Sequence, residues 1–253
     1  MRFADPQTIG KHVSFISDML PAGTFSIVQD QVERVLSKGE TKLGFAFGFS
    51  LLLAIWSANG GMKAIIDALN VVYDEKEKRG FVKLNLYSLT FTLGALVAVL
   101  AAIGLVVAAP FILASAGLGK VGDLLLTYAR WPALAMMILL GLAVLYRFAP
   151  SRQAPKWKWV SVGSITAAVA WLLGSAALSC YLANYAGYDA TYGSLGAAIG
   201  LMMWMWMSTI VVLFGAELNS EIEHQTVIDS TSGSEKPLGD RGAKMADTVG
   251  RSR

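Results

Sequence analysis

The chain has 253 residues, of which 55% are hydrophobic and only 15% are charged. A soluble protein of this length needs more polar side chains to cover its surface, so the composition excludes an ordinary water-soluble globule and predicts a membrane protein. The formal net charge of +3 could suggest a nucleic-acid binder, but the basic residues gather beside long uncharged segments. We therefore expect no nucleic acid among the partners.

Residues 1–42 precede the first long uncharged segment and carry two short amphipathic patterns. Apolar residues recur there every three or four positions, which predicts helices that lie on the membrane or pack against a bundle. These residues are Ile9, Val13, Ile16, Leu20, Phe25, Val28, Val32 and Val35. We expect residues 1–42 to form an extracytoplasmic arm.

Five uncharged stretches follow, and a bilayer core of about 30 Å needs roughly 20 apolar residues to cross it. Only helices and closed barrels satisfy every backbone group in lipid, and no alternating ten-residue strands are present. We therefore expect an all-α, polytopic transmembrane helical bundle over residues 43–223. The third stretch is the shortest, so Arg130 and Arg147 must extend to the two membrane surfaces. The predicted crossings are 43–59, 86–108, 131–148, 159–181 and 195–216.

Basic residues predict the orientation of the bundle, because cytoplasmic loops are rich in lysine and arginine. They concentrate after the first and third crossings, whereas residues 187–194 contain none. These basic residues are Lys63, Lys76, Lys78, Arg79, Lys83, Arg147, Arg152, Lys156 and Lys158. Alternation of the crossings then places residues 224–253 in the cytoplasm, where their Ser, Thr, Gly and Asp content predicts a disordered tail.

Residues that commonly carry enzymatic chemistry are scarce in this chain. The two histidines, His12 and His224, lie at opposite ends, and Cys180 is the single cysteine. This arrangement lacks the clustered ligands of a metallohydrolase and permits no intramolecular disulfide. A GxGxxG motif spans 117–122, but it lies between two crossings with no preceding strand, which indicates a turn. We expect no metal, no cofactor and no enzymatic activity.

Polar residues near the helix ends are the candidates for a ligand site. The middle of every predicted crossing lacks charge, which argues against a proton relay through the membrane. Each candidate also has a structural explanation, such as helix capping by Asp189 or an aromatic belt of tyrosines at the lipid headgroups. The candidates are Tyr188, Asp189, Thr191, Tyr192 and Gly193 at the predicted outer end, and Asn70, Tyr73, Glu217 and Asn219 at the inner end.

Three segments go beyond generic membrane features. They are WSANGGMKAIIDALNVVYDEKEKRGFVKL at 56–84, YRFAPSRQAPKWKWVSVGS at 146–164, and YDATYGSLGAAIGLMMWMWMSTIVVLFGAELNSEIE at 188–223. Their order and spacing resemble the YihY/BrkB family of bacterial inner-membrane proteins, over residues 3–223. The resemblance implies a multi-pass inner-membrane protein of unestablished activity, whose relatives are sometimes labelled ribonuclease BN or linked to virulence. It also implies six crossings, so we expect that the family's first helix has been lost from this sequence.

Three functions are open at this point. The first is a transporter or permeation protein for a small or lipid-like solute, because the chain is a polytopic bundle without a soluble domain. The second is a non-catalytic envelope component that acts through other envelope proteins or as a homo-oligomer, because small residues recur at helix-packing spacing. The third is a ribonuclease, which is least favoured because neither a ligand cluster nor a basic groove is visible. All three have the lipid bilayer as a partner.

Overall fold

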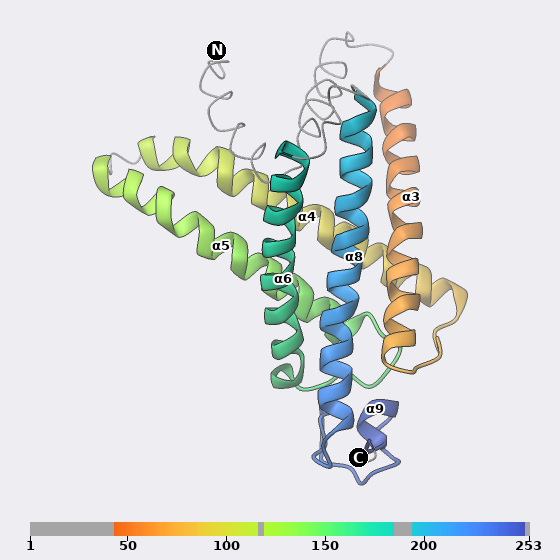
Figure 1. Cartoon of the computed structure of the whole chain (residues 1–253). Coiled ribbons are helices and arrows are strands. Elements are labelled where there is room, and N and C mark those ends of the chain that lie inside the picture. Colours follow the sequence, from red (N-terminus) through yellow and green to blue (C-terminus); the bar gives the residue numbers. More distant parts are fainter. Residues whose placement is uncertain (1–42, 116–118, 185–193, 251–253) are drawn as a thin grey trace. The chain divides into compact units, whose positions relative to one another are not determined.

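The computed structural model describes residues 43–115, 119–184 and 194–250, and within these ranges the chain is helical with no strand. The helices are α3 (Leu43–Val72), α4 (Phe81–Ser115), α5 (Gly119–Phe148), α6 (Trp157–Asn184), α8 (Ser194–His224) and the short α9 (Lys244–Asp247) (Figure 1). The all-α prediction is confirmed. The predicted arm at 1–42 and the candidates at 188–193 lie outside the described residues.

Each of the five long helices contains a stretch that is long and apolar enough to cross a membrane. The stretches are Phe47–Val72, Phe81–Val106, Trp131–Phe148, Trp157–Asn184 and Gly196–His224. Large apolar side chains are exposed along them, such as Leu52 at 67% and Trp56 at 72%. Exposure of this kind is unfavourable in water and favourable in hydrocarbon, so the helices carry the surface of a membrane protein.

The first crossing is longer than predicted, because α3 continues through Gly60 and Gly61 to Val72. The predicted end of this helix at residue 59 is therefore wrong. A glycine inside a helix costs only about 1 kcal/mol relative to alanine. Beyond the pair, Ile66 and Leu69 are fully buried, and their packing keeps the helix intact.

The chain divides into two compact units, and segments of several helices contribute to each. Among the described residues, unit 1 comprises 43–51, 100–115, 119–133, 171–184 and 194–209. Unit 2 comprises 52–99, 134–170 and 210–250.

In unit 1, α6 packs against α8 through two tryptophans. The rings of Trp171 and Trp204 lie edge to face with centroids 5.6 Å apart. The indole nitrogen of Trp171 donates to Ser208 at 2.8 Å, and that of Trp204 donates to Ser175 at 3.1 Å. Each partly buried indole N–H is therefore satisfied across the helix pair, as apolar surroundings require.

In unit 2, α6 and α8 approach each other through glycines. A Cβ atom placed on Gly163 would lie 2.0 Å from the backbone oxygen of Gly215, and one placed on Gly215 would lie 2.6 Å from the Cβ of Ala167. Close approach through small residues is the usual way to pack helices in lipid. The sequence analysis did not predict this contact.

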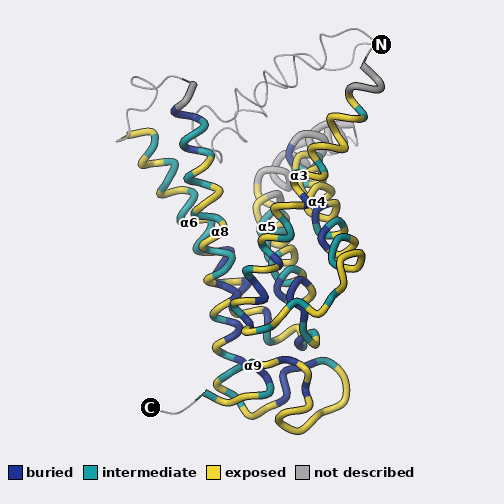
Figure 2. Tube along the Cα trace, turned by 90° about the vertical axis from the view of Figure 1, so that its right-hand side faces the viewer, coloured by how far each residue is buried: buried dark blue, intermediate teal, exposed yellow. Residues whose placement is uncertain are grey.

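The apolar core of unit 2 joins α3, α5, α6 and α8. Its buried members are Ile66, Leu69, Tyr73, Tyr146, Ala149, Val160, Ala167 and Ala216. The Tyr146 hydroxyl donates to the Val212 carbonyl of α8 at 2.7 Å. In unit 2, buried positions are most frequent where the helices end and the segment carrying α9 begins (Figure 2).

The segment after α8 has a defined path with internal contacts as far as residue 250, whereas its composition predicted a disordered tail. Residues 225–250, here called the C-terminal segment, leave α8 and return to it, because Gly250 N donates to His224 O at 2.9 Å. Arg241 in this segment is only 4% exposed. The composition predicted disorder because few apolar residues are available, but backbone hydrogen bonds and buried polar side chains supply the order instead.

Candidate functional site

A cluster of buried polar side chains lies at one end of unit 2, where α3 ends, α5 connects to α6, and α8 ends. We call this cluster the polar end. Its central members are Asn70, Tyr73, Arg152, Asn219 and Glu223, all of which have buried side chains. Buried polar groups need hydrogen-bond partners, so the hydrogen bonds of these side chains show which segments the cluster connects and which of its atoms are unmatched.

Asn70, in the last turn of α3, joins two connecting loops. Its Oδ1 accepts from Ser151 N at 2.7 Å, and its Nδ2 donates to Glu77 Oε2 at 3.0 Å. The side chain therefore ties the α3–α4 loop to the α5–α6 loop.

Arg79 strengthens the same link between the loops. Its Nε donates to Glu77 Oε1 at 2.7 Å, and its Nη2 donates to Ala149 O at 2.7 Å. Burial opposes ionisation of Glu77, but the hydrogen bonds from Arg79 and Asn70 outweigh it and lower the pKa of this carboxyl to about 2. Glu77 is therefore ionised at neutral pH.

A buried ion pair occupies the centre of the polar end. Arg152 Nη1 donates to Glu223 Oε2, and the two side chains are each 1% exposed. The guanidinium carbon lies 3.8 Å from the centroid of the Tyr73 ring, a cation–π contact. Burial raises the pKa of the Tyr73 hydroxyl to about 12, although the Arg152 charge acts in the opposite direction. Tyr73 is therefore neutral at physiological pH.

The ion pair does not use all of its hydrogen-bonding atoms. Arg152 Nε and Nη2 and Glu223 Oε1 are buried, and none has a hydrogen-bond partner within the described part of the chain. Leaving a buried donor or acceptor unmatched costs about 1–3 kcal/mol, and more for a charged group. The arrangement can therefore bind a polar group that offers acceptors to Arg152 and a donor to Glu223.

Asn219 and Ser220 hold the end of α8 in place. Asn219 Oδ1 accepts from Gly163 N at 2.8 Å on α6, and Ser220 Oγ donates to Val72 O at 3.0 Å. The Ser220 contact satisfies one of the carbonyls that a helix end leaves unpaired. These contacts fix α3 and α6 against α8 around the ion pair.

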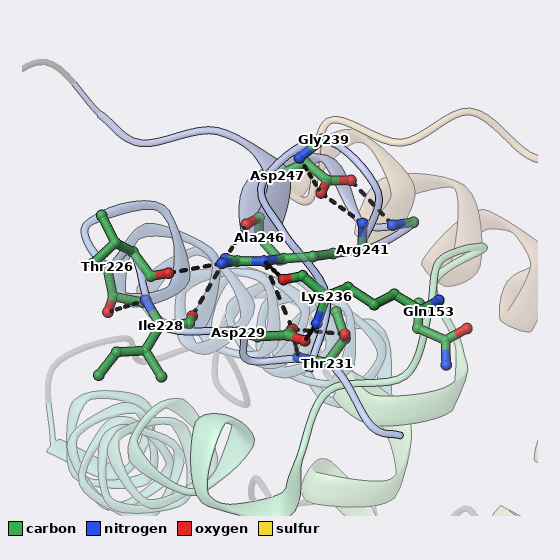
Figure 3. Close-up of polar contacts among 12 residues, drawn as sticks. Gln153, Thr226, Ile228, Asp229, Thr231, Lys236, Gly239, Arg241, Ala246 and Asp247 are labelled. Carbon is green, nitrogen blue, oxygen red and sulfur yellow. Dashed lines mark hydrogen bonds and ion pairs between the residues drawn. The ribbon is translucent and has the colours of Figure 1, made fainter. Parts of the chain in front are cut away.

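The C-terminal segment is organised around Arg241 (Figure 3). Arg241 Nη1 donates to Ala246 O at 2.7 Å, Nη2 donates to Val227 O at 2.7 Å, and Nε donates to Lys236 O at 3.2 Å. The guanidinium also lies 3.9 Å from Asp229 Oδ1. One buried side chain therefore gathers distant parts of the segment into a closed loop.

Two aspartates complete this loop (Figure 3). Asp247 accepts from the backbone nitrogens of Gly239, Arg241 and Gly242 at 2.8 to 3.0 Å. Burial opposes ionisation of Asp229, but hydrogen bonds from Thr231 and the Lys236 backbone outweigh it and lower the pKa of Asp229 to about 2. Both carboxylates accept hydrogen bonds from backbone N–H groups that would otherwise bond to backbone carbonyls in a helix or strand.

The C-terminal segment contacts the loop that carries Arg152. Gln153 N donates to Gly242 O at 3.0 Å, Lys156 N donates to Ser230 O at 2.7 Å, and Ser232 N donates to Ala154 O at 2.9 Å. These bonds come immediately after Arg152 in the chain. The segment therefore holds the Arg152 loop in position beside Glu223.

The structure brings together some of the predicted site residues and separates others. Asn70, Tyr73 and Asn219 are buried at the polar end. Glu217 is exposed on α8, so it does not join the cluster. Tyr188, Asp189, Thr191, Tyr192 and Gly193 lie outside the described residues.

Arg152 and Glu223 were missed as site residues. Arg152 entered the prediction only as a loop charge, and Glu223 only as the last residue of the predicted bundle at 43–223. Among the described residues no group of three or more His, Cys, Asp and Glu side chains could hold a metal ion. The sequence offers little indication that Arg152 and Glu223 would pair, because 71 positions separate them.

Comparison with known proteins identifies related chains. A family model described as virulence factor BrkB matches residues 3–238. The ribonuclease-like protein YfkH of Bacillus subtilis is 32% identical over 209 residues, which cover 81% of this chain and 74% of YfkH. A UPF0761 membrane protein of Idiomarina loihiensis is 23% identical over 83% of this chain and 71% of its own length. A UPF0761 membrane protein of Vibrio cholerae is 26% identical over 82% and 67%, respectively. No solved structure matches the chain.

Proposed function

Because the chain belongs to the virulence factor BrkB family of membrane proteins, we propose that it is a transporter or permeation protein for a small or lipid-like solute. It works in the bacterial inner membrane as a multi-pass protein with the C-terminal segment in the cytoplasm, and it catalyses no covalent chemistry. The relatives are membrane proteins whose names assign no transported solute.

The buried pair of Arg152 and Glu223 carries this proposal. Both side chains are 1% exposed, and Arg152 Nε, Arg152 Nη2 and Glu223 Oε1 have no partner among the described residues. A purely structural ion pair becomes favourable only when its remaining hydrogen-bonding atoms are also satisfied. A solute with an anionic oxygen and a hydroxyl or ammonium donor matches these atoms, because a guanidinium prefers oxyanions and a carboxylate accepts hydrogen bonds.

Flux measurements in proteoliposomes test the proposal. The full chain is reconstituted and loaded with pools of small organic anions in one set of vesicles and fluorescent phospholipids in another. The wild type should move at least one pool faster than empty vesicles. Arg152→Gln should reduce this flux at least tenfold, because it removes the charged donors. Lys158→Gln should leave the flux unchanged, since Lys158 is an exposed cation on the same hairpin.

Misfolding of a variant is separated from loss of the site by a matched double substitution. Arg152→Gln combined with Glu223→Gln removes both buried charges, so it should fold at least as well as the single variant and still lack flux. No flux of any pool by the wild type contradicts the proposal. Full flux in a folded Arg152→Gln protein contradicts it equally.

A second function, that of a non-catalytic envelope component acting through membrane-protein partners, has one observation in its favour. The C-terminal segment is ordered, yet it leaves four large apolar side chains exposed: Val227, Ile228, Leu238 and Val249. Crosslinking in native membranes should then recover a stable partner that Ile228→Ser abolishes. Recovery of the same partner with this variant would remove the support.

A nuclease role is the weakest candidate, because only the name of YfkH suggests it. Purified protein should leave RNA intact under conditions in which a control ribonuclease cuts it. Cleavage that a single Asp, Glu or His substitution abolishes would replace the transport proposal.

A further inference from the structure

Arg147, in the last turn of α5, contacts two aromatic rings. Its guanidinium carbon is 4.4 Å from the centroid of the Trp157 ring and 5.2 Å from that of Phe148. The two rings lie edge to face with centroids 6.1 Å apart. The rings therefore hold the guanidinium in a defined orientation at the α5–α6 hairpin.

This side chain lies where two stretches that are long and apolar enough to cross a membrane come to an end. The stretch of α5 ends at Phe148, and that of α6 begins at Trp157. Phe148 is 42% exposed and Trp157 is 50% exposed, so both rings form part of the outer surface of unit 2. Half-exposed aromatic rings at the end of a span lie at the depth of the lipid headgroups.

Arg147, which is partly buried, differs in its partners from Arg79, Arg152 and Arg241 of unit 2. Arg79 and Arg152 pair with glutamates, and Arg241 binds carbonyl oxygens. Within the described residues, Arg147 has no carboxylate partner, and its Nε and Nη1 are buried without a hydrogen-bond acceptor. The aromatic rings stabilise the charge but offer these N–H groups no acceptor in the plane of the guanidinium.

The anchoring of Arg147 also suits a fixed binding site. The preceding residue, Tyr146, donates to Val212 O on α8 at 2.7 Å. Two positions later, Ala149 O accepts from Arg79 Nη2 at 2.7 Å. Hydrogen bonds therefore hold the residues on both sides of Arg147, so its guanidinium has a fixed position rather than that of a side chain on a mobile loop.

We propose that Arg147, Phe148 and Trp157 bind the phosphate group of an anionic phospholipid. A guanidinium matches two phosphate oxygens with parallel N–H donors, and a phosphate at headgroup depth is the acceptor that the bilayer supplies. The half-exposed rings contact the glycerol and upper acyl region, which favours a lipid over free phosphate. The site is distinct from the Arg152 pair and does not depend on the transport proposal.

Lipid binding to the full chain in detergent, measured by native mass spectrometry, tests this site. The probes are phosphatidylglycerol and phosphatidylcholine with identical acyl chains. The wild type should bind phosphatidylglycerol at least fivefold more tightly. Arg147→Gln should abolish the preference, and Arg147→Lys should keep only part of it, because an ammonium is a point charge without the planar fork. Lys158→Gln is the matched control, and it should keep the preference.

Two further measurements keep the test decisive. The thermal midpoint of each variant shows whether it folds, and Trp157→Leu offers a second substitution that keeps apolar bulk but removes the ring, so it should weaken phosphatidylglycerol binding. Unchanged preference in a folded Arg147→Gln protein overturns the proposal. Equal loss in Lys158→Gln overturns it as well, because the binding would then reflect general surface charge. Displacement of the lipid by millimolar inorganic phosphate assigns the site to small anions and overturns the lipid assignment.

Discussion

Replacing Gly163 by alanine should force α6 and α8 apart in unit 2. A Cβ at this position would lie 2.0 Å from Gly215 O and 2.5 Å from Asn219 Cγ. Carbon–oxygen contacts in proteins are normally roughly 3.3–3.6 Å. The nearest atom belongs to the backbone, so a side-chain rotation cannot relieve the clash and the helices must separate.

The expected loss of stability follows from three contributions. Overpacking of a close contact costs about 1–3 kcal/mol. Weakening of the bond from Gly163 N to Asn219 Oδ1, which is 2.8 Å long, costs about 1 kcal/mol. Alanine returns about 1 kcal/mol through its higher helix propensity. The net destabilisation is about 1–3 kcal/mol, which corresponds to a fall in thermal midpoint of roughly 2–12 °C for a protein of this size.

Thermal unfolding in detergent, followed by circular dichroism, measures this change. Gly141→Ala is the matched control, because a Cβ on Gly141 of α5 meets nothing within 4 Å. The control should be as stable as the wild type or slightly more stable. Gly215→Ala should behave like Gly163→Ala, since its Cβ would lie 2.6 Å from Ala167 Cβ. Equal midpoints for Gly163→Ala and Gly141→Ala would refute the close helix contact.

Three further predictions concern the polar end and the C-terminal segment. Glu223→Gln should destabilise the protein by about 3–5 kcal/mol, because it leaves the Arg152 charge buried and unpaired. A double-mutant cycle with Arg152→Gln measures this, and simple additivity would contradict it. Arg241→Gln should release the C-terminal segment, because the substitution removes the hydrogen bonds from the Arg241 guanidinium to Ala246 O, Val227 O and Lys236 O. Limited proteolysis should then cut within residues 226–250, whereas Lys236→Gln should stay resistant; equal resistance of both variants would argue against the role of Arg241. Folding lowers the pKa of Asp229 from 3.8 to about 2, so the ionised carboxylate adds about 2 kcal/mol to the free energy of unfolding. This stabilisation is present above pH 4 and is lost as the pH falls through 2. Asp229→Asn should flatten this acid transition in hydrogen exchange of the C-terminal segment, and an unchanged transition would exclude Asp229 as its cause.

The membrane character of the chain could be predicted from the sequence alone. Hydrophobicity over some twenty residues is a local property, and lipid leaves the backbone few alternatives to a helix. The third crossing was predicted at 131–148; the structure has a longer helix there, α5 at Gly119–Phe148, and its stretch Trp131–Phe148 is long and apolar enough to cross a membrane. The path of α3 past Gly60 and Gly61 was not predictable, since the buried packing of Ile66 and Leu69 outweighs the local cost of the glycines.

The candidate site depended much more on the tertiary structure. Asn70, Tyr73 and Asn219 were named from the sequence because polar residues at the ends of apolar helices are unusual in themselves, and the structure buries all three at the polar end. Arg152 and Glu223 were not found, because a loop arginine and a helix-end glutamate look like ordinary solvated charges until the chain brings them together. The structure of the C-terminal segment could not be predicted for the same reason. It is stabilised by hydrogen bonds between positions far apart in the sequence, such as the one from Gln153 N to Gly242 O. The local composition of each helix determines whether lipid or water surrounds it. The burial of a charge depends instead on all the segments that the fold packs around it.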